Sequence, residues 1–264
     1  LLEAGLSIGT DGNRIELGNA ALLAARTLTN GANSNLWLRK LGSTNDLEVG
    51  SATIQNSAST LDNAISATGQ TTVANSVATV LKGLSTTANN GYITLTTQGG
   101  DLTLTQAVTA HGSGYVDIRT ANTGNLGDIA INNGTTVSST SGTVQLIAGN
   151  TLTTDSANGT TTEFSTTGNV LLEAGLSVGS DSNRIELAST SILAARTLGN
   201  GSGSHLWLRK LESTSNLEVG TVAVQNSAST LDHAVAATGQ TTVANAVATH
   251  LKGLSTTANN GNIT

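Results

Sequence analysis

The side chains in this 264-residue chain that could do chemistry are mainly carboxylates, because the sequence has no cysteine and four histidines. The lack of cysteine excludes thiol catalysis and cysteine-based metal sites. A glycosidase needs two carboxylates about 5 to 10 Å apart. Glu16 and Glu48, however, alternate with apolar residues and therefore point outward near Arg14 and Arg39, where solvated ion pairs are the simpler interpretation. The sequence predicts no catalytic site and no enzyme activity.

Oxygen ligands for a metal ion occur in two related turns. "GTDGNRIEL" places Asp11 beside Asn13, and "GSDSNRIEL" places Asp181 beside Asn183. A calcium loop brings several carboxylates and carbonyls together, and each of these turns has one acid. Asp and Asn also favour turns by bonding to their own backbone. We interpret all four as turn residues, keep them as weak metal candidates, and expect no cofactor.

An aromatic residue and a cation lie two positions apart in the repeated string "LWLRK". Trp37 and Arg39 fall on the outward side of the expected strand, and Trp207 and Arg209 repeat the arrangement. Such a pair could stack on a sugar or on a neighbouring chain. It could equally cover a flank of the protein itself. We favour internal packing or a lateral contact, and keep the four residues as a candidate surface contact.

The chain repeats itself over a long distance. Residues 1–94 align with 171–264 without a gap, and about 69 of the 94 positions are identical. The sequence thus holds one complete unit, 1–170, and a partial second unit, 171–264, of one continuous structure. We expect the chain to be a window from a longer array, because both ends fall inside strand-like segments.

Comparison of the two copies also shows whether the histidines are retained. His205, His233 and His250 correspond to Asn35, Asn63 and Val80 in the first copy, so these imidazoles are not retained between copies. His111 lies in a part of the unit that occurs once. A histidine-based metal or acid–base site is therefore not expected.

A shorter rhythm runs inside the unit, in which a turn residue precedes two apolar residues separated by one polar residue. This is the period-two pattern of a half-buried strand. A β-sandwich would show many short strands too, but its core usually uses aromatic residues, and this chain has one Phe, two Tyr and two Trp. We predict a parallel β-solenoid with coils of roughly 20 to 27 residues. The pattern recurs at Ile93/Leu95, Leu102/Leu104, Val116/Ile118, Ile129/Ile131, Val144/Leu146, Val170/Leu172, Ile185/Leu187, Leu206/Leu208 and Leu217/Val219.

One segment, 59–85, departs from this rhythm. Leu61, Ile65, Val73 and Val77 follow the spacing of a helix face, and Gly83 could end the helix. We predict a short helical excursion in each unit. A strand pair in "TTVANSVATV" remains open as an alternative.

The net charge and the length of the apolar runs limit the kinds of partner that the chain is expected to bind. The net charge is −6 with only 11 Lys and Arg residues, which argues against binding to nucleic acid or to an anionic membrane. No apolar run approaches the roughly 18 residues that a membrane span requires. We expect neither nucleic-acid binding nor membrane insertion.

The strings "NNGYITLTTQGGDLTLTQAVTAHGSGYVDI", "GTVQLIAGNTLTT" and "TGNVLLEAGLSVGS" resemble the G-x-I-x-L-x-T repeats of filamentous haemagglutinin-like and giant bacterial surface adhesins. The resemblance covers most of the chain. It implies a right-handed parallel β-helix, exported and displayed as a long rod at the bacterial cell surface. This sequence differs from that group in its very long and nearly exact unit.

The function expected from these observations is mechanical: an extracellular fibre or adhesin shaft that extends and spaces something from the cell surface. Its expected partners are further copies of the repeat, end to end or lateral, and cell-surface glycans. At about seven coils a unit, each unit would add roughly 35 Å. The alternatives are a carbohydrate-binding or carbohydrate-cleaving β-helix, and an ice-binding solenoid suggested by Thr pairs such as Thr94/Thr96, Thr103/Thr105 and Thr151/Thr153.

Overall fold

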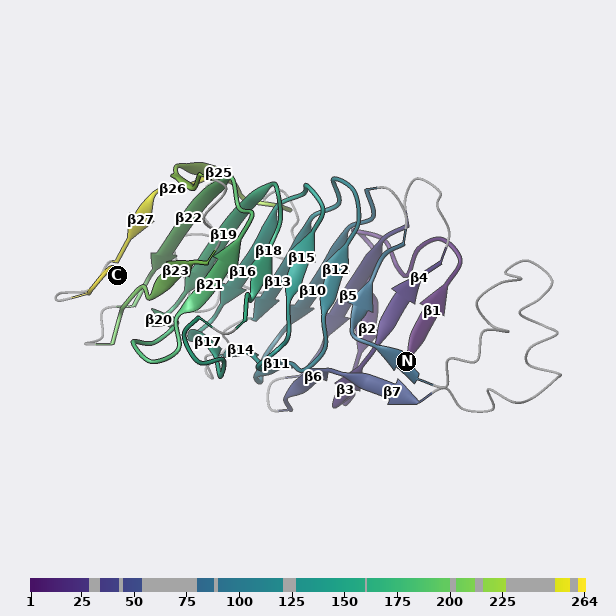
Figure 1. The fold of residues 1–264 in the computed structure, drawn as a ribbon. Helices are drawn as coiled ribbons and strands as arrows, with labels where there is room; N and C mark the ends of the chain where they lie inside the picture. The colour runs from purple at the N-terminus through teal and green to yellow at the C-terminus, as the bar shows by residue number, and fades with distance from the viewer. Residues whose placement is uncertain are drawn as a thin grey trace, which may run out of the picture.

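In the residues that it describes, the computed structural model shows strands and no helix, and these strands wind into a parallel β-solenoid (Figure 1). The two ends of the chain lie toward opposite ends of the stack of strands. No helix able to span a membrane is found in the part of the chain that the structure describes. That part comprises residues 1–28, 34–42, 45–53, 80–87, 90–120, 127–159, 161–199, 203–211, 216–226, 250–256 and 261–264.

Three parallel sheets form the sides of the solenoid in these residues, and the successive coils up to β20 contribute one strand to each. The eight-stranded sheet contains β1 (Leu2–Ala4), β4 (Ala25–Thr27), β9 (Leu84–Ser85), β12 (Val108–Ala110), β15 (Val137–Ser139), β18 (Phe164–Ser165), β21 (Ile185–Ala188) and β23 (Leu208–Lys210). The six-stranded sheet contains β3 (Leu22–Leu23), β6 (Leu47–Val49), β11 (Leu102–Leu104), β14 (Ile129–Ile131), β17 (Thr151–Thr154) and β20 (Ser177–Val178).

The nine-stranded sheet carries the longest strands. It contains β2 (Ile15–Leu17), β5 (Leu36–Lys40), β10 (Ile93–Thr97), β13 (Val116–Thr120), β16 (Val144–Ala148), β19 (Asn169–Ala174), β22 (Ile192–Thr197), β24 (Glu218–Val219) and β27 (Leu254–Ser255).

The core is a set of aliphatic columns inside the coils, as the period-two pattern predicts. Ile93 pairs with Val116 and Leu95 with Ile118 on successive strands, so residues of one type stack along the axis. Each fully buried aliphatic side chain contributes about 1.5 to 3 kcal/mol. The predicted inward residues of β10, β11, β13, β14, β16 and β19 all have no exposed surface: Ile93, Leu95, Leu102, Leu104, Val116, Ile118, Ile129, Ile131, Val144, Leu146, Val170 and Leu172.

Two antiparallel hairpins interrupt the winding, one in each copy of the repeat. The first hairpin pairs β7 (Ser51–Thr53) with β8 (Val80–Lys82), and the second pairs β25 (Thr221–Ala223) with β26 (His250–Lys252). At the base of the first, the Gly83 N–H donates to the Gly50 carbonyl over 2.9 Å. β7 and β8 form a two-stranded sheet of their own and belong to none of the three sheets of the solenoid. The unit therefore makes between five and six turns, and the estimate of seven was too high.

The helix predicted for 59–85 is wrong where the structure describes it. Leu81 pairs with Ala52 in the first hairpin, and Leu84 pairs with Ala25 and with Val108 in the eight-stranded sheet. Gly83, with a φ of +63°, turns the chain between these two strands. The rest of the predicted helix, 59–79, lies outside the described residues.

The two copies of the repeat keep the same strand register but lie on different sides of the solenoid. Leu2 pairs with Ala25, and Leu172 pairs in the same way with Ala195. Leu2, however, belongs to the eight-stranded sheet, whereas Leu172 belongs to the nine-stranded sheet. The unit therefore does not contain a whole number of turns, and the second copy is rotated about the axis relative to the first.

A column of glycines lets the coils approach closely at the corner that leads into the nine-stranded sheet. A Cβ atom on Gly142 would overlap the carbonyl oxygen of Gly114, and one on Gly114 would overlap that of Gly91. Ser139 Oγ also donates to the Gly114 carbonyl, over 2.5 Å. Only residues without a side chain fit this stack.

Replacing Gly142 by Ala is expected to lower the free energy of unfolding by about 1 to 3 kcal/mol, because the backbone of the adjacent coil cannot give way cheaply. Urea unfolding measures the change. Gly12→Ala is the control, since a Cβ there meets nothing within 4 Å, and a change within about 0.5 kcal/mol is expected. Equal effects at the two sites would contradict the close stacking of the corner.

Candidate functional site

The predicted surface aromatics are held by their own turns. The Arg14 guanidinium lies 5.4 Å from the centre of the Trp37 ring, and Arg184 lies 5.6 Å from that of Trp207. Trp37 is 8% exposed. The turn between Gly9 and Arg14 thus folds back over the indole, a contact that the outward parity of Trp37 did not reveal. These are cation–π contacts within one chain.

The two arginines of the predicted surface contact form ion pairs across neighbouring coils. These arginines are Arg39 and Arg209. Arg39 Nη1 lies 3.9 Å from Glu16 Oε1, and Arg209 Nη1 lies 3.6 Å from Glu186 Oε1. Both pairs join residues one coil apart in parallel register. The interpretation of Glu16 as an outward ion-pair partner agrees with this geometry.

The weak metal candidates lie in turns and face arginine. Asp11 Oδ1 is 3.2 Å from Arg14 Nη2, and Asp181 Oδ1 is 3.1 Å from Arg184 Nη2. Asn13 closes its turn by donating its backbone N–H to the Thr10 carbonyl, over 3.2 Å. Asn183 donates its backbone N–H to Ser180 Oγ. Within the described residues, no group of three or more His, Asp or Glu side chains comes together to hold a metal ion.

Outward residues of the nine-stranded sheet form a buried polar ladder, which we define as Thr94, Asp117, Arg119 and Gln145. Thr94, Asp117 and Gln145 face one another on consecutive strands β10, β13 and β16. Arg119 Nε donates to Asp117 Oδ1 over 2.9 Å, and Gln145 Nε2 donates to the same oxygen over 2.6 Å. All four side chains are buried although they lie on the outside of the solenoid.

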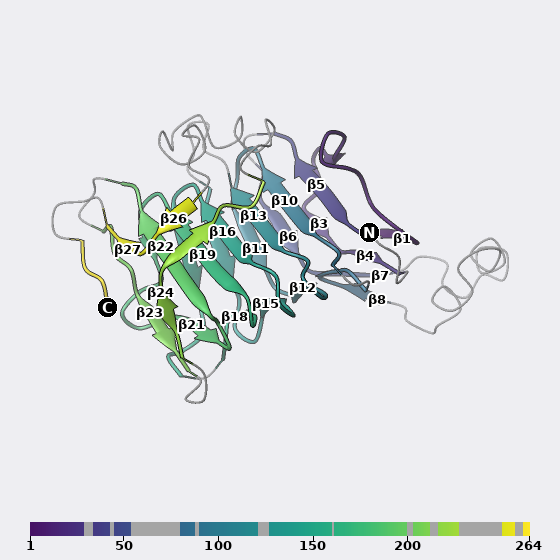
Figure 2. The same cartoon turned by 90° about the horizontal axis from the view of Figure 1, so that it is seen from above.

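The second hairpin covers this outer face (Figure 2). Its strands β25 and β26 lie across the strands of the nine-stranded sheet. Val222, Val224 and Leu251 form an apolar cluster with outward residues of three sheet strands, namely Ile147, Leu171 and Ala194. The cluster continues the polar ladder along the sheet, so one covered strip has a polar half and an apolar half.

The segment that follows β25 contacts the polar ladder through its backbone and one amide side chain. The Gln225 N–H donates to Gln145 Oε1 over 2.8 Å, and Arg119 Nη2 donates to the Gln225 carbonyl. Asn226 Nδ2 donates to Asp117 Oδ2 over 2.8 Å and to Thr94 Oγ1 over 3.2 Å. These bonds compensate for the burial of the Asp117–Arg119 ion pair, which would otherwise be costly.

Tyr115, next to the ladder, also contacts Asn226. Its hydroxyl donates to Asn226 Oδ1 over 2.5 Å, and its ring stacks on Tyr92 with centroids 4.4 Å apart. Burial, with Asp117 nearby, raises the pKa of the Tyr115 hydroxyl. The phenol therefore stays protonated and available as a donor at neutral pH.

Glu173, on β19, is buried in the same strip. Burial raises its pKa from 4.5 to about 7, against the opposing effect of Arg196. Arg196 Nε donates to Glu173 Oε2 over 2.7 Å. Glu173 Oε1 accepts no hydrogen bond from the described residues. In the equivalent pair of the first copy, Glu3 and Arg26, the carboxylate is more exposed than Glu173.

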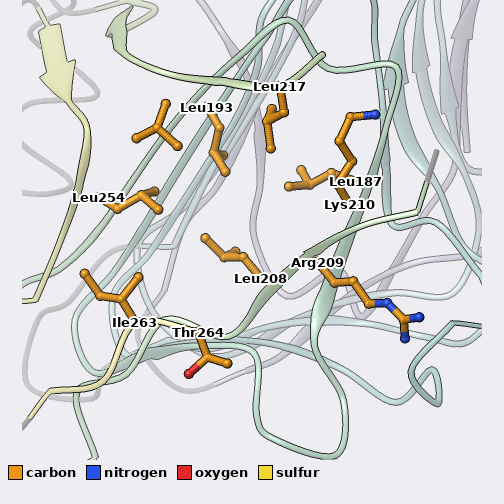
Figure 3. A pocket seen from close by; sticks show the side chains of 10 residues that line it. Leu187, Leu193, Leu208, Arg209, Lys210, Leu217, Leu254, Ile263 and Thr264 are labelled. Carbon is orange, nitrogen blue, oxygen red and sulfur yellow. The ribbon is translucent and has the colours of Figure 1, made fainter. Parts of the chain in front are cut away.

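The described solenoid has an open apolar end beyond β22 and β23. A pocket of about 190 Å³ lies there, and Figure 3 shows leucine and isoleucine side chains gathered around it. Ile263 is 48% exposed and Val219 is 50% exposed, whereas their counterparts Ile93 and Val49 have no exposed surface. The pocket is lined by Leu187, Leu193, Leu208, Arg209, Lys210, Leu217, Val219, Leu254, Ile263 and Thr264.

His205 shows why one histidine replaces an asparagine. Asn35 Oδ1 accepts the Tyr92 backbone N–H over 2.8 Å, and His205 Nδ1 accepts the Asn262 backbone N–H over 3.0 Å. Both side chains therefore serve as an acceptor for the next coil.

Comparisons with family models, with curated proteins and with solved structures find no match for this chain. The resemblance to filamentous haemagglutinin-like repeats therefore stays a prediction.

The polar ladder was missed from the sequence. Two signals pointed to it: charged and amide residues at outward positions of the long strands, and the dipeptide Gln-Asn retained at 55–56 and at 225–226. Neither signal indicates that a segment 80 or more residues after the ladder would cover the sheet.

Proposed function

We propose that this protein is a structural shaft: an extracellular fibre or adhesin stalk that holds length at a bacterial cell surface. The observation that carries the proposal is the repetition of one register. Ile15 pairs with Leu38 as Ile185 pairs with Leu208, so the same residues make the same coil twice in one continuous solenoid. The inward side chains of each coil stack on those of its neighbours, and units can be added without redesigning the core.

The partner proposed for the open end is a further copy of the same unit. In the first copy, the residues that match the pocket lining are covered by the coil that contains β11, β12 and β13. Val49 pairs with Leu104, Leu84 with Val108, and Ile93 with Val116. A second copy of residues 95–170 therefore fits the apolar end by the same register.

Two observations weigh against the alternatives in the described residues. Trp37 is covered by Arg14, which reduces its use as a sugar platform. Thr94 and Thr96 are buried, so this Thr pair does not form part of a flat ice-binding face. The shaft therefore remains the proposal.

The test is to append a second copy of residues 95–170 after Thr264, and to measure the dimensions of both chains by small-angle X-ray scattering. A shaft predicts an unchanged cross-section and a length that increases by about 15 to 20 Å for three to four further coils, since strands stack about 4.8 Å apart. A compact particle, or growth in the cross-section, would contradict the proposal. Electron microscopy of the native particle then tests whether it is an unbranched filament.

A further inference from the structure

The polar ladder and the segment that covers it come from different units. All four ladder residues and Tyr115 lie within 1–170, whereas Gln225 and Asn226 lie in the second unit. The chain between the ladder and this segment is long, because the Arg119–Gln225 and Asp117–Asn226 bonds join residues 106 and 109 positions apart. The contact is therefore a tertiary interface between consecutive units.

The chain has two such Gln-Asn segments for one complete ladder. Gln55 and Asn56 match Gln225 and Asn226 in the sequence, but Asp117, Arg119 and Gln145 belong to a part of the unit that occurs once. In a series of units there would be one Gln-Asn segment for each ladder, and each ladder would bind the segment of the unit that follows.

The hydrogen-bonding groups of the ladder are complementary to those of this segment. It offers a carboxylate oxygen to the Asn226 amide, a guanidinium to the Gln225 carbonyl, and an amide oxygen to the Gln225 N–H. Two of the bonds involve ionised groups, which are the stronger kind. A segment without the Asn side chain would leave Asp117 Oδ2 without this donor inside a covered face.

We propose that the polar ladder is a peptide-binding site that recognises the Gln-Asn segment, and that it accepts this segment from a second copy of the chain when its own is absent. The ligand is thus an extended peptide of this protein, with an asparagine amide on Asp117 and a backbone N–H on Gln145. The inference does not depend on the mechanical role, so peptide binding can fail while the shaft stands.

The first experiment vacates the site in the full chain with the double substitution Gln225→Pro and Asn226→Ala, which removes the Gln225 N–H that donates to Gln145 and the Asn226 amide that donates to Asp117. A fluorescent peptide with the sequence of residues 222–230, VAVQNSAST, is then titrated and followed by fluorescence anisotropy. Binding is expected to be at least tenfold tighter to the vacated chain than to the wild-type chain, whose ladder is filled. Equal binding to both chains would overturn the proposal, as would no binding to either.

Specificity is tested on the peptide and on the ladder. A peptide with Ala in place of both Gln and Asn is expected to bind the vacated chain at least tenfold more weakly. Adding Gln145→Ala to the vacated chain removes the acceptor for the Gln225 N–H, and is expected to weaken binding of the native peptide to a similar extent. An unchanged affinity in either case would show binding to another surface.

The docking within one chain is tested without any peptide. The Gln225 amide, which donates to Gln145 Oε1, is expected to exchange its hydrogen at least tenfold faster in Gln145→Ala than in wild type. The matched control substitutes Gln55 and Asn56 by Ala, which removes the other Gln-Asn segment and leaves the ladder bonds in place. The proposal fails if this control accelerates exchange at Gln225 as much as Gln145→Ala does.

Discussion

Replacing Leu38 by Ala is expected to lower the free energy of unfolding by about 2 to 5 kcal/mol, the range for large cavities in a packed core. Leu38 has no exposed surface and lies between Ile15 and Leu95 on the neighbouring coils. Its counterpart Leu208 pairs with Ile185 but is only half-buried, at the open end. Leu208→Ala is therefore expected to cost less than half as much.

Urea unfolding of the two variants and the wild type measures this difference. The comparison is well matched, because both leucines lie in the same pentapeptide "LWLRK". When a second copy of residues 95–170 follows Thr264, Leu208→Ala is expected to become as destabilising as Leu38→Ala. Equal losses in the original chain would show that stacking on both sides does not determine the stability of a coil.

Replacing Glu173 by Gln is expected to stabilise the protein more at pH 8 than at pH 5. The pKa of Glu173 in the folded chain is raised from 4.5 to about 7. The folded chain therefore binds more protons than the unfolded chain between these values, and the contribution of this group to stability falls as the pH rises through them. The full shift corresponds to a stability difference on the order of 3 kcal/mol.

The measured quantity is the difference in free energy of unfolding between Glu173→Gln and wild type, at pH 5 and at pH 8. Using a difference removes the contributions of all other titrating groups. Glu3→Gln is the control: Glu3 faces Arg26 as Glu173 faces Arg196, but Glu3 is more exposed than Glu173, and an effect below about 1 kcal/mol is expected. A Glu173→Gln effect that is the same at both pH values would contradict the buried, destabilised carboxylate.

The inward residues of the solenoid were predictable because strand periodicity depends on neighbours in the sequence. Leu102 and Leu104 alternate with polar residues, and both are buried opposite Ile129 and Ile131 of the next coil. The fold class follows from the same pattern together with the scarcity of aromatic residues. Local signals of this kind do not require knowledge of distant contacts.

The outer face was not predictable in the same way. Thr94 and Asp117 have the parity of solvent-facing residues, and their burial depends on a hairpin that follows more than 100 residues later. The helix predicted for 59–85 was wrong in its described part, because the strands on either side of Gly83, β8 and β9, pair with β7 and β4. In both cases tertiary pairing determined the structure.

The rotation of the second copy affects how the molecule can meet a flat object. The first hairpin lies beside β3 and β6 of the six-stranded sheet, and the second lies over the nine-stranded sheet (Figures 1 and 2). A planar surface laid against the nine-stranded sheet touches the second hairpin and leaves the first on another side. Equivalent hairpins of consecutive copies therefore face different directions around the axis.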